Sequence, residues 1–187
     1  VTLTNKTLPA TVNVLLTDDQ KTIYSATLQV KGNKPYLWDD IYTGGGDADP
    51  GPSYEIPGEA LSDPAFAALM EEATKYLGYP YVWGGSSPST SFDCSGFVCW
   101  VFTHSGVHNL PRTTATGIYN QCAIVSPSEA KPGDCIFFTG TYDSAGPVSH
   151  IGIYVGGMMI HCGDPIKYAN INTNYWQQHF YAFGRLN

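Results

Sequence analysis

The chain has 187 residues, of which 43% are hydrophobic and 13% charged, and its formal net charge is −7. This composition is typical of a folded globular protein and excludes an intrinsically disordered chain. With only nine lysine and arginine residues, the protein is not expected to use nucleic acid or an anionic membrane as its main partner, because both attract basic surfaces.

The N-terminal part of the sequence has the pattern of a small β-structure. Residues 11–31 contain two apolar runs around the polar turn TDDQ, which predicts a β-hairpin, and residues 35–42 are suited to a third strand. Residues 43–59 are rich in Gly, Pro and Asp, which indicates a linker or an ordered crossing loop, and the aspartates lack the spacing of an EF-hand calcium loop. We therefore expect a small β-rich region with its linker at 1–57 and a larger domain at 58–187.

The larger part begins with a helical pattern and ends with a pattern of strands. Ser62 as N-cap, Pro64 in the first turn and Gly78 as a stop predict the first helix. Further along, KPGDCIFFTG predicts a turn and a strand, SHIGIYVGGMMIHCG a hairpin, and FYAFGRL a final strand. Helices followed by an antiparallel sheet indicate an α+β fold.

The stretch SFDCSGFVCW, residues 91–100, is the first candidate for a functional site. Asp93 is a favoured helix N-cap, and Gly106 supplies a stop, so we expect Cys94 in the first turn of a buried helix. The helix dipole favours a thiolate at this end, which predicts a lowered pKa for Cys94 and makes it a candidate nucleophile. From this pattern alone, a packed and inert thiol remains the alternative.

The cysteines are an odd number, five, and none of their spacings fits a zinc module. At least one thiol therefore stays unpaired within the chain, and we expect no metal site and no disulfides. The cysteines are Cys94, Cys99, Cys122, Cys135 and Cys162.

The hairpin sequence HIGIYVGGMMIHC predicts two histidines side by side. A two-residue Gly-Gly turn places Ile153 opposite Ile160 and puts His150 and His161 on one face of the sheet, diagonal to each other. The small Gly152 leaves room between them. A thiol at a helix start, with a histidine oriented by a second polar group, is what thiol catalysis needs.

Five motifs in this order resemble the NlpC family of cell-wall cysteine peptidases: YVWGG, DCSGFV, LPRTT, KPGDCIFF and HIGIYVGGMMIHC. The resemblance covers about residues 62–187. It implies a papain-like α+β fold, in which helices, including the one that carries the catalytic cysteine, pack on a central antiparallel sheet. It also implies hydrolysis of amide bonds in bacterial peptidoglycan stem peptides through a thioester, most often between D-γ-glutamate and the diamino acid, without a metal or organic cofactor.

The resemblance also implies roles for individual residues. Cys94 matches the nucleophile, His150 the base, and His161 the third residue, which orients the base. Tyr81 of YVWGG matches a tyrosine whose hydroxyl helps to hold the oxyanion, although packing against a neighbouring tryptophan is the alternative for this ring. The positions that flank the nucleophile match positions that line the substrate groove, and they are Asp93 and Ser95.

Two other functions stay open at this point. One is a catalytically silent module that binds wall peptides in the same groove, and the other is an amidase that cuts the N-acetylmuramoyl–L-Ala bond or a crossbridge. Groove loops set such choices, and residues 81–92 and 139–149 are the loops we suspect. The expected partners are stem peptides, with no nucleic acid and no membrane span in this chain.

The expected setting follows from the substrate. We expect a monomer that is extracellular or associated with the cell wall, as part of a longer secreted or membrane-anchored protein. An accessory role, such as wall binding or restriction of the groove, is expected for residues 1–57.

Overall fold

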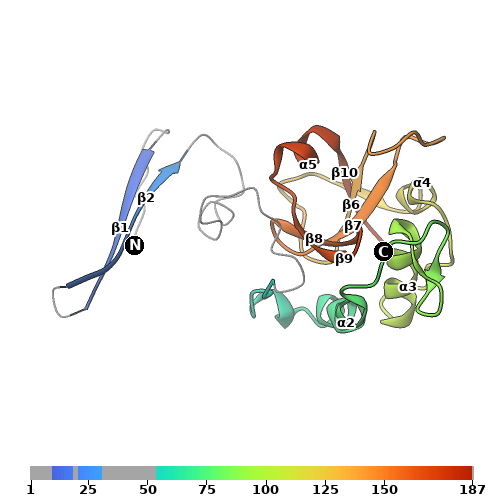
Figure 1. Cartoon of the computed structure of the whole chain (residues 1–187), viewed down its shortest axis with the longest axis horizontal. Coiled ribbons are helices and arrows are strands. Elements are labelled where there is room, and N and C mark those ends of the chain that lie inside the picture. The colour runs from blue at the N-terminus through green and yellow to red at the C-terminus, as the bar shows by residue number, and fades with distance from the viewer. Residues whose placement is uncertain (1–9, 19–20, 31–53, 187) are drawn as a thin grey trace. The chain divides into compact units, whose positions relative to one another are not determined.

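The computed structural model describes the backbone of residues 10–18 and 21–30, and the whole of residues 54–186 (Figure 1). The chain divides into two compact units, Val1–Gly46 and Asp47–Asn187. Within the described residues, no helix combines the length and the apolar character that crossing a membrane requires.

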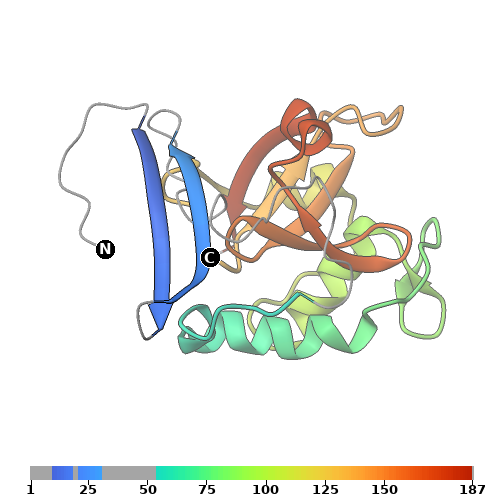
Figure 2. The same ribbon diagram turned by 60° about the vertical axis from the view of Figure 1, so that its left-hand side comes forward.

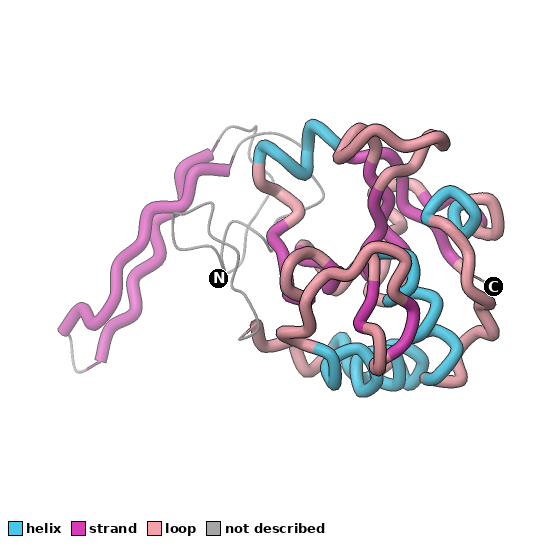
Figure 3. Tube along the Cα trace, turned by 45° about the vertical axis from the view of Figure 1, so that its right-hand side comes forward, coloured by secondary structure: helices cyan, strands magenta, loops and turns pink. Residues whose placement is uncertain are grey.

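The first unit contains an antiparallel β-hairpin, drawn as a pair of magenta strands in Figure 3. Its strands are β1 (Ala10–Asp18) and β2 (Lys21–Val30). The hairpin predicted at residues 11–31 is therefore confirmed. The third strand predicted at residues 35–42 lies outside the described residues.

The second unit has short helices and 3-10 turns around a sheet. They are η1 (Ala60–Ser62), α2 (Pro64–Ala73), η2 (Thr74–Tyr76), α3 (Cys94–His104), α4 (Ala115–Tyr119) and α5 (Asn174–His179). The N-cap of α2 is Asp63, whose carboxylate accepts from the backbone amide of Ala65 at 2.9 Å. The prediction of Ser62 as this cap is wrong because Ser62 lies in the preceding turn, where its hydroxyl donates to the Glu59 carbonyl.

Six antiparallel strands form the sheet of the second unit, in the order β5-β10-β6-β7-β8-β9. They are β5 (Ala123–Val125), β6 (Cys135–Phe138), β7 (His150–Tyr154), β8 (Met158–Cys162), β9 (Ile166–Asn170) and β10 (Phe180–Arg185). A separate two-stranded ribbon, β3 (Ser86–Ser87) with β4 (Ser91–Phe92), precedes α3. The α+β architecture expected from the sequence is confirmed.

Both faces of the central strands are buried, because side chains alternate between two apolar clusters. The larger cluster joins α2 and α3 to one face of the sheet, with Phe97 and Ile151 among its fully buried members. The smaller cluster covers the other face and includes Phe138, with Trp176 of α5 packed against it. Accordingly, α2 and α3 lie on one side of the sheet and α5 on the other (Figure 1 and Figure 2).

Candidate active site

Cys94 is the first residue of α3 and is only 4% exposed. The N-cap is Asp93, as predicted, and its carboxylate accepts from the backbone amide of Gly96 at 2.7 Å. A Cβ on Gly96 would lie 2.1 Å from the carbonyl oxygen of Gly85. The glycine of the DCSG motif therefore lets the first turn of α3 touch the backbone of the preceding loop, and this contact fixes where Cys94 lies.

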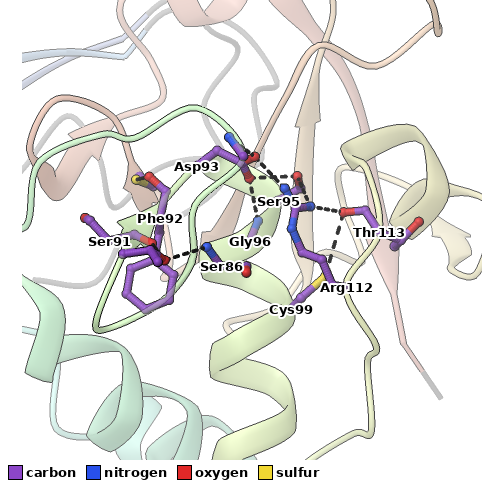
Figure 4. Close-up of polar contacts among 12 residues, drawn as sticks. Ser86, Ser91, Phe92, Asp93, Ser95, Gly96, Cys99, Arg112 and Thr113 are labelled. Atoms are coloured by element: carbon purple, nitrogen blue, oxygen red, sulfur yellow. Dashed lines mark hydrogen bonds and ion pairs between the residues drawn. The ribbon is translucent and has the colours of Figure 1, made fainter.

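The Asp93 carboxylate, which precedes the nucleophile in the chain, forms hydrogen bonds with three segments (Figure 4). Its Oδ1 accepts from the Ser95 hydroxyl at 3.0 Å, and its Oδ2 accepts from the Gly84 backbone amide at 3.1 Å and from Arg112. The Arg112 guanidinium also donates to the Ser95 hydroxyl at 2.8 Å. Asp93 and Ser95 therefore hold the loops around Cys94 in place, and their predicted contact with substrate stays a prediction.

The pKa of Cys94 differs from the sequence prediction. Burial raises the pKa of the thiol to about 11, and the Asp93 carboxylate acts in the same direction. Hydrogen bonds from the backbone amides of Ile151 and Ser95 and the charge of Arg112 oppose this rise but do not cancel it. The prediction of a lowered pKa is wrong for this site, because the desolvation of a buried thiolate outweighs the favourable helix terminus.

The two predicted histidines are hydrogen-bonded to each other. Ile153 pairs with Ile160 across β7 and β8, which confirms the predicted register. The Nε2 atom of His150 lies 2.8 Å from the Nδ1 atom of His161. A Cβ on Gly152 would lie 3.2 Å from the Cβ of His161, so the glycine provides the space that the sequence suggested.

Burial determines the protonation of this pair. It lowers the pKa of His150 to about 4 and that of His161 well below its usual range, so both rings are neutral near pH 7. In a neutral imidazole one nitrogen donates and the other accepts. Because Nε2 of His150 is engaged with His161, its Nδ1 is the nitrogen available to a thiol.

The nucleophile lies next to the start of β7. The Ile151 amide that bonds to Cys94 belongs to the residue immediately after His150. Helix α3 also packs directly on β7 and β8. The fold therefore brings Cys94 to the end of the strand pair that carries His150 and His161.

Tyr81 lies in the loop before β3. Its backbone forms an isolated bridge with Phe92, and its amide donates to the Asp164 carboxylate at 3.3 Å. Burial raises the pKa of the phenol, and negative charge on Cys94 and Asp93 raises it further. The hydroxyl therefore stays protonated, and its predicted role as an oxyanion donor stays a prediction.

An exposed aromatic pair joins the two loops suspected from the sequence. Trp83 is 72% and Tyr142 42% exposed, and their ring centroids are 5.4 Å apart in an edge-to-face arrangement. Burial raises the pKa of Tyr142, and negative charge on Cys94 and Asp93 raises it further, which indicates that Tyr142 lies near the nucleophile. Sequence reasoning identified both loops but not the contact between these two rings.

Among the described residues, no group of three or more His, Cys, Asp or Glu side chains is arranged to hold a metal ion. All five cysteines are free thiols. Cys162 is buried on β8, and its thiol donates to the Phe92 carbonyl at 3.2 Å.

Comparison with known proteins shows that most of the second unit matches a family of related sequences. A model described as the NlpC/P60 family matches residues 78–185. The bifunctional muramidase/DL-endopeptidase CwlT of Bacillus subtilis is 45% identical over 123 residues, which are 65% of this chain and 36% of that protein. The gamma-DL-glutamyl hydrolase of Bacillus subtilis is 40% identical over 124 residues, which are 62% of this chain and 29% of that protein. This chain thus spans about a third of the length of these curated relatives.

Solved structures agree with this comparison. A Staphylococcus aureus protein described as similar to lipoprotein, NLP/P60 family, has a TM-score of 0.64 and 44% identity, and the match covers 66% of this chain and 42% of that one. The NlpC/p60 domain of the peptidoglycan hydrolase SagA has a TM-score of 0.52 and 32% identity, with 64% and 97% covered.

Proposed function

The chain belongs to the NlpC/P60 family, and on this basis we propose that it hydrolyses amide bonds in peptidoglycan stem peptides by thiol catalysis. One observation carries the proposal. The His150–His161 hydrogen bond lies at the start of β7, and the next residue of that strand, Ile151, bonds through its amide to Cys94 at the start of α3. A nucleophile, a base and a group that orients the base are the elements that acyl transfer to sulfur requires.

The bond between D-γ-glutamate and the diamino acid is the proposed site of cleavage. Relatives of 45% and 40% identity are named a DL-endopeptidase and a gamma-DL-glutamyl hydrolase, which supports this choice. The exposed pair of Trp83 and Tyr142 would form one side of the groove, where flat rings can pack against the stem peptide.

In the proposed reaction the Cys94 sulfur attacks the amide carbonyl while its proton moves to Nδ1 of His150. The proton moves during attack because the thiol and both imidazoles rest in their neutral forms. The same proton passes to the leaving amine as the C–N bond breaks, and a thioester remains on Cys94. His150 then takes a proton from water as the water attacks the thioester. The C–S bond breaks, the proton passes from His150 to the Cys94 sulfur, and the new carboxyl group leaves.

Three groups would support this chemistry. His161 accepts the Nε2 proton of His150 and keeps its Nδ1 directed at the sulfur. The backbone amide of Cys94 and the hydroxyl of Tyr81 would donate to the oxyanion, and the loss of one such donor costs about 10² to 10³ in rate.

A silent binding module is the main rival. A structural neighbour from Mycobacterium tuberculosis, RipD, is described as a non-catalytic NlpC/p60 domain protein adapted to peptidoglycan binding, but at 21% identity it shares the fold alone. The presence of Cys94, His150 and His161 together favours an enzyme. We further propose that the chain works at the cell wall as a monomer, and that residues 1–57 have an accessory role.

Digestion of peptidoglycan of known stem chemistry tests this function. Wild type, Cys94→Ala and the control Cys122→Ser are incubated with purified peptidoglycan, and mass spectrometry identifies the fragments released. Fragments from wild type and the control alone, cut after D-γ-glutamate, are expected. Cleavage at another amide bond would refute the proposed bond, and co-sedimentation with the wall without any fragment would indicate a binding module.

A further inference from the structure

Trp176 on α5 contacts both histidines of the candidate site. Its ring is nearly parallel to that of His150, at 24° with centroids 5.4 Å apart, and it meets the ring of His161 edge to face at 5.3 Å. It also packs on Phe138, at 4.6 Å between centroids. Phe138 is the cross-strand partner of His150 in the sheet.

The residues around Trp176 hold it in place. The Thr173 hydroxyl caps α5 and accepts from the Trp176 backbone amide at 3.4 Å. At the other end of the helix, His179 Nδ1 donates to the Thr139 carbonyl at 2.7 Å. The helix is thus fixed at both ends, and the indole lies against His150 as a fixed surface.

We propose that Trp176 is a positioning residue for the thiol reaction: its indole face holds the ring plane of His150 and stabilises the imidazolium that forms when His150 takes the proton of Cys94. This inference rests on the proposed function. The hydrogen bond to His161 holds the His150 ring only at Nε2, and a single hydrogen bond by itself leaves some freedom in the plane of the ring. A flat surface against the ring removes this freedom and keeps Nδ1 directed at the sulfur.

The electrostatic part of the inference follows from the surroundings of His150. His161 on β8 shares a hydrogen bond with His150, Cys94 on α3 bonds to the amide of the next residue in β7, and Lys167 on β9 pairs with His161 across the strands. His161 accepts a hydrogen bond from His150 but carries no negative charge to balance an imidazolium, and the positive charge of Lys167 lowers the pKa of His161 in the same pair. The negative face of an indole does favour such a charge, and most strongly where water is excluded.

Trp100 offers a matched control. It stacks on His104, with centroids 3.6 Å apart and planes at 13°, and its indole N–H bonds to Glu72 and Tyr76. Trp100→Phe therefore removes a tryptophan stacked on a histidine outside the site, at a measurable cost in stability. Trp176→Leu removes the aromatic face at the site but keeps an apolar side chain there, and Trp176→Phe restores an aromatic face.

The test uses the full chain and two readouts. The first is the pH profile of kcat and KM on a γ-D-glutamyl–diamino acid peptide, and the second is the rate of Cys94 alkylation by iodoacetamide. We expect Trp176→Leu to lower kcat and the alkylation rate about tenfold with KM changed less than about twofold, and to move the acidic limb of kcat/KM down by about half a unit to one unit. Trp176→Phe should recover most of the loss, and Trp100→Phe should leave the pH profile unchanged.

The inference is wrong if Trp176→Leu matches wild type in kcat, pH profile and alkylation rate. It is also wrong if Trp100→Phe and Trp176→Leu lose activity in proportion to their loss of Tm, because the effect would then be structural. Alkylation requires no wall substrate. A failure of wild type to cleave any peptide would therefore count against the proposed function, while the alkylation rates would still decide the role of Trp176.

Discussion

Burial of the histidine pair predicts that the protein loses stability as the pH falls from 6.5 towards 4. In the folded chain burial lowers the pKa of His150 from its ordinary value of 6.5 to about 4. Between these two values the unfolded chain binds a proton that the folded chain does not, so acidification favours unfolding. The part of the free energy of unfolding that depends on the neutral His150 ring is therefore fully present above pH 6.5, and it is lost as the pH falls from 6.5 to about 4.

The size of this effect follows from the difference between the two pKa values. A difference of about 2.5 pH units, at about 1.36 kcal/mol for each, gives roughly 3 kcal/mol at pH 4. His161 acts in the same direction, because burial also lowers its pKa. A loss of this size is a large fraction of the stability of an ordinary domain, which is about 5 to 15 kcal/mol.

The assay is urea denaturation of the full chain, followed by tryptophan fluorescence between pH 7 and pH 4. Wild type is compared with His150→Gln, which removes the titrating ring, and with His108→Gln, which removes a histidine outside the pair. We expect His150→Gln to be less stable than wild type at pH 7 and the gap to close by about 3 kcal/mol at pH 4. A gap that stays constant across this range, or closes equally for His108→Gln, would refute the reasoning.

Three further substitutions give measurable outcomes. Asp93→Asn removes a charge that raises the pKa of Cys94, so iodoacetamide alkylation at pH 8 should become about three- to tenfold faster. Gly96→Ala places a methyl group 2.1 Å from the Gly85 carbonyl oxygen and should lower Tm by about 10 °C in calorimetry, from a cost of about 3 kcal/mol. Trp83→Ala should raise KM for a stem peptide about three- to tenfold with kcat little changed, and an unchanged KM would contradict its place in the groove.

Patterns among residues that are close in the sequence predicted the features that bring the histidines together. The Gly-Gly turn determines the register of the hairpin, and the register alone puts His150 and His161 on one face, which the structure confirms. The cap at Asp93 was equally local, because its side chain bonds within its own helix turn.

Features that depend on tertiary packing were missed. The pKa of Cys94 is raised because α3 is buried against the sheet, and a short sequence motif does not report the depth of burial. Helix α5 spans only Asn174–His179 and has no buried residue, so it lacks the apolar repeat by which a helix is recognised. The contact between Trp176 and the histidines was therefore not predicted, because the helix that carries Trp176 was not recognised.

The most direct test of the central claim is to trap the thioester on Cys94. Wild type and Cys94→Ala are mixed with a γ-D-glutamyl–diamino acid peptide, quenched in acid within one turnover, and analysed by intact and peptide mass spectrometry. The account predicts a fraction of wild-type chains heavier by the acyl half of the substrate, with the added mass on Cys94 and none on Cys94→Ala. Cleavage of the peptide by Cys94→Ala at the wild-type rate would contradict it.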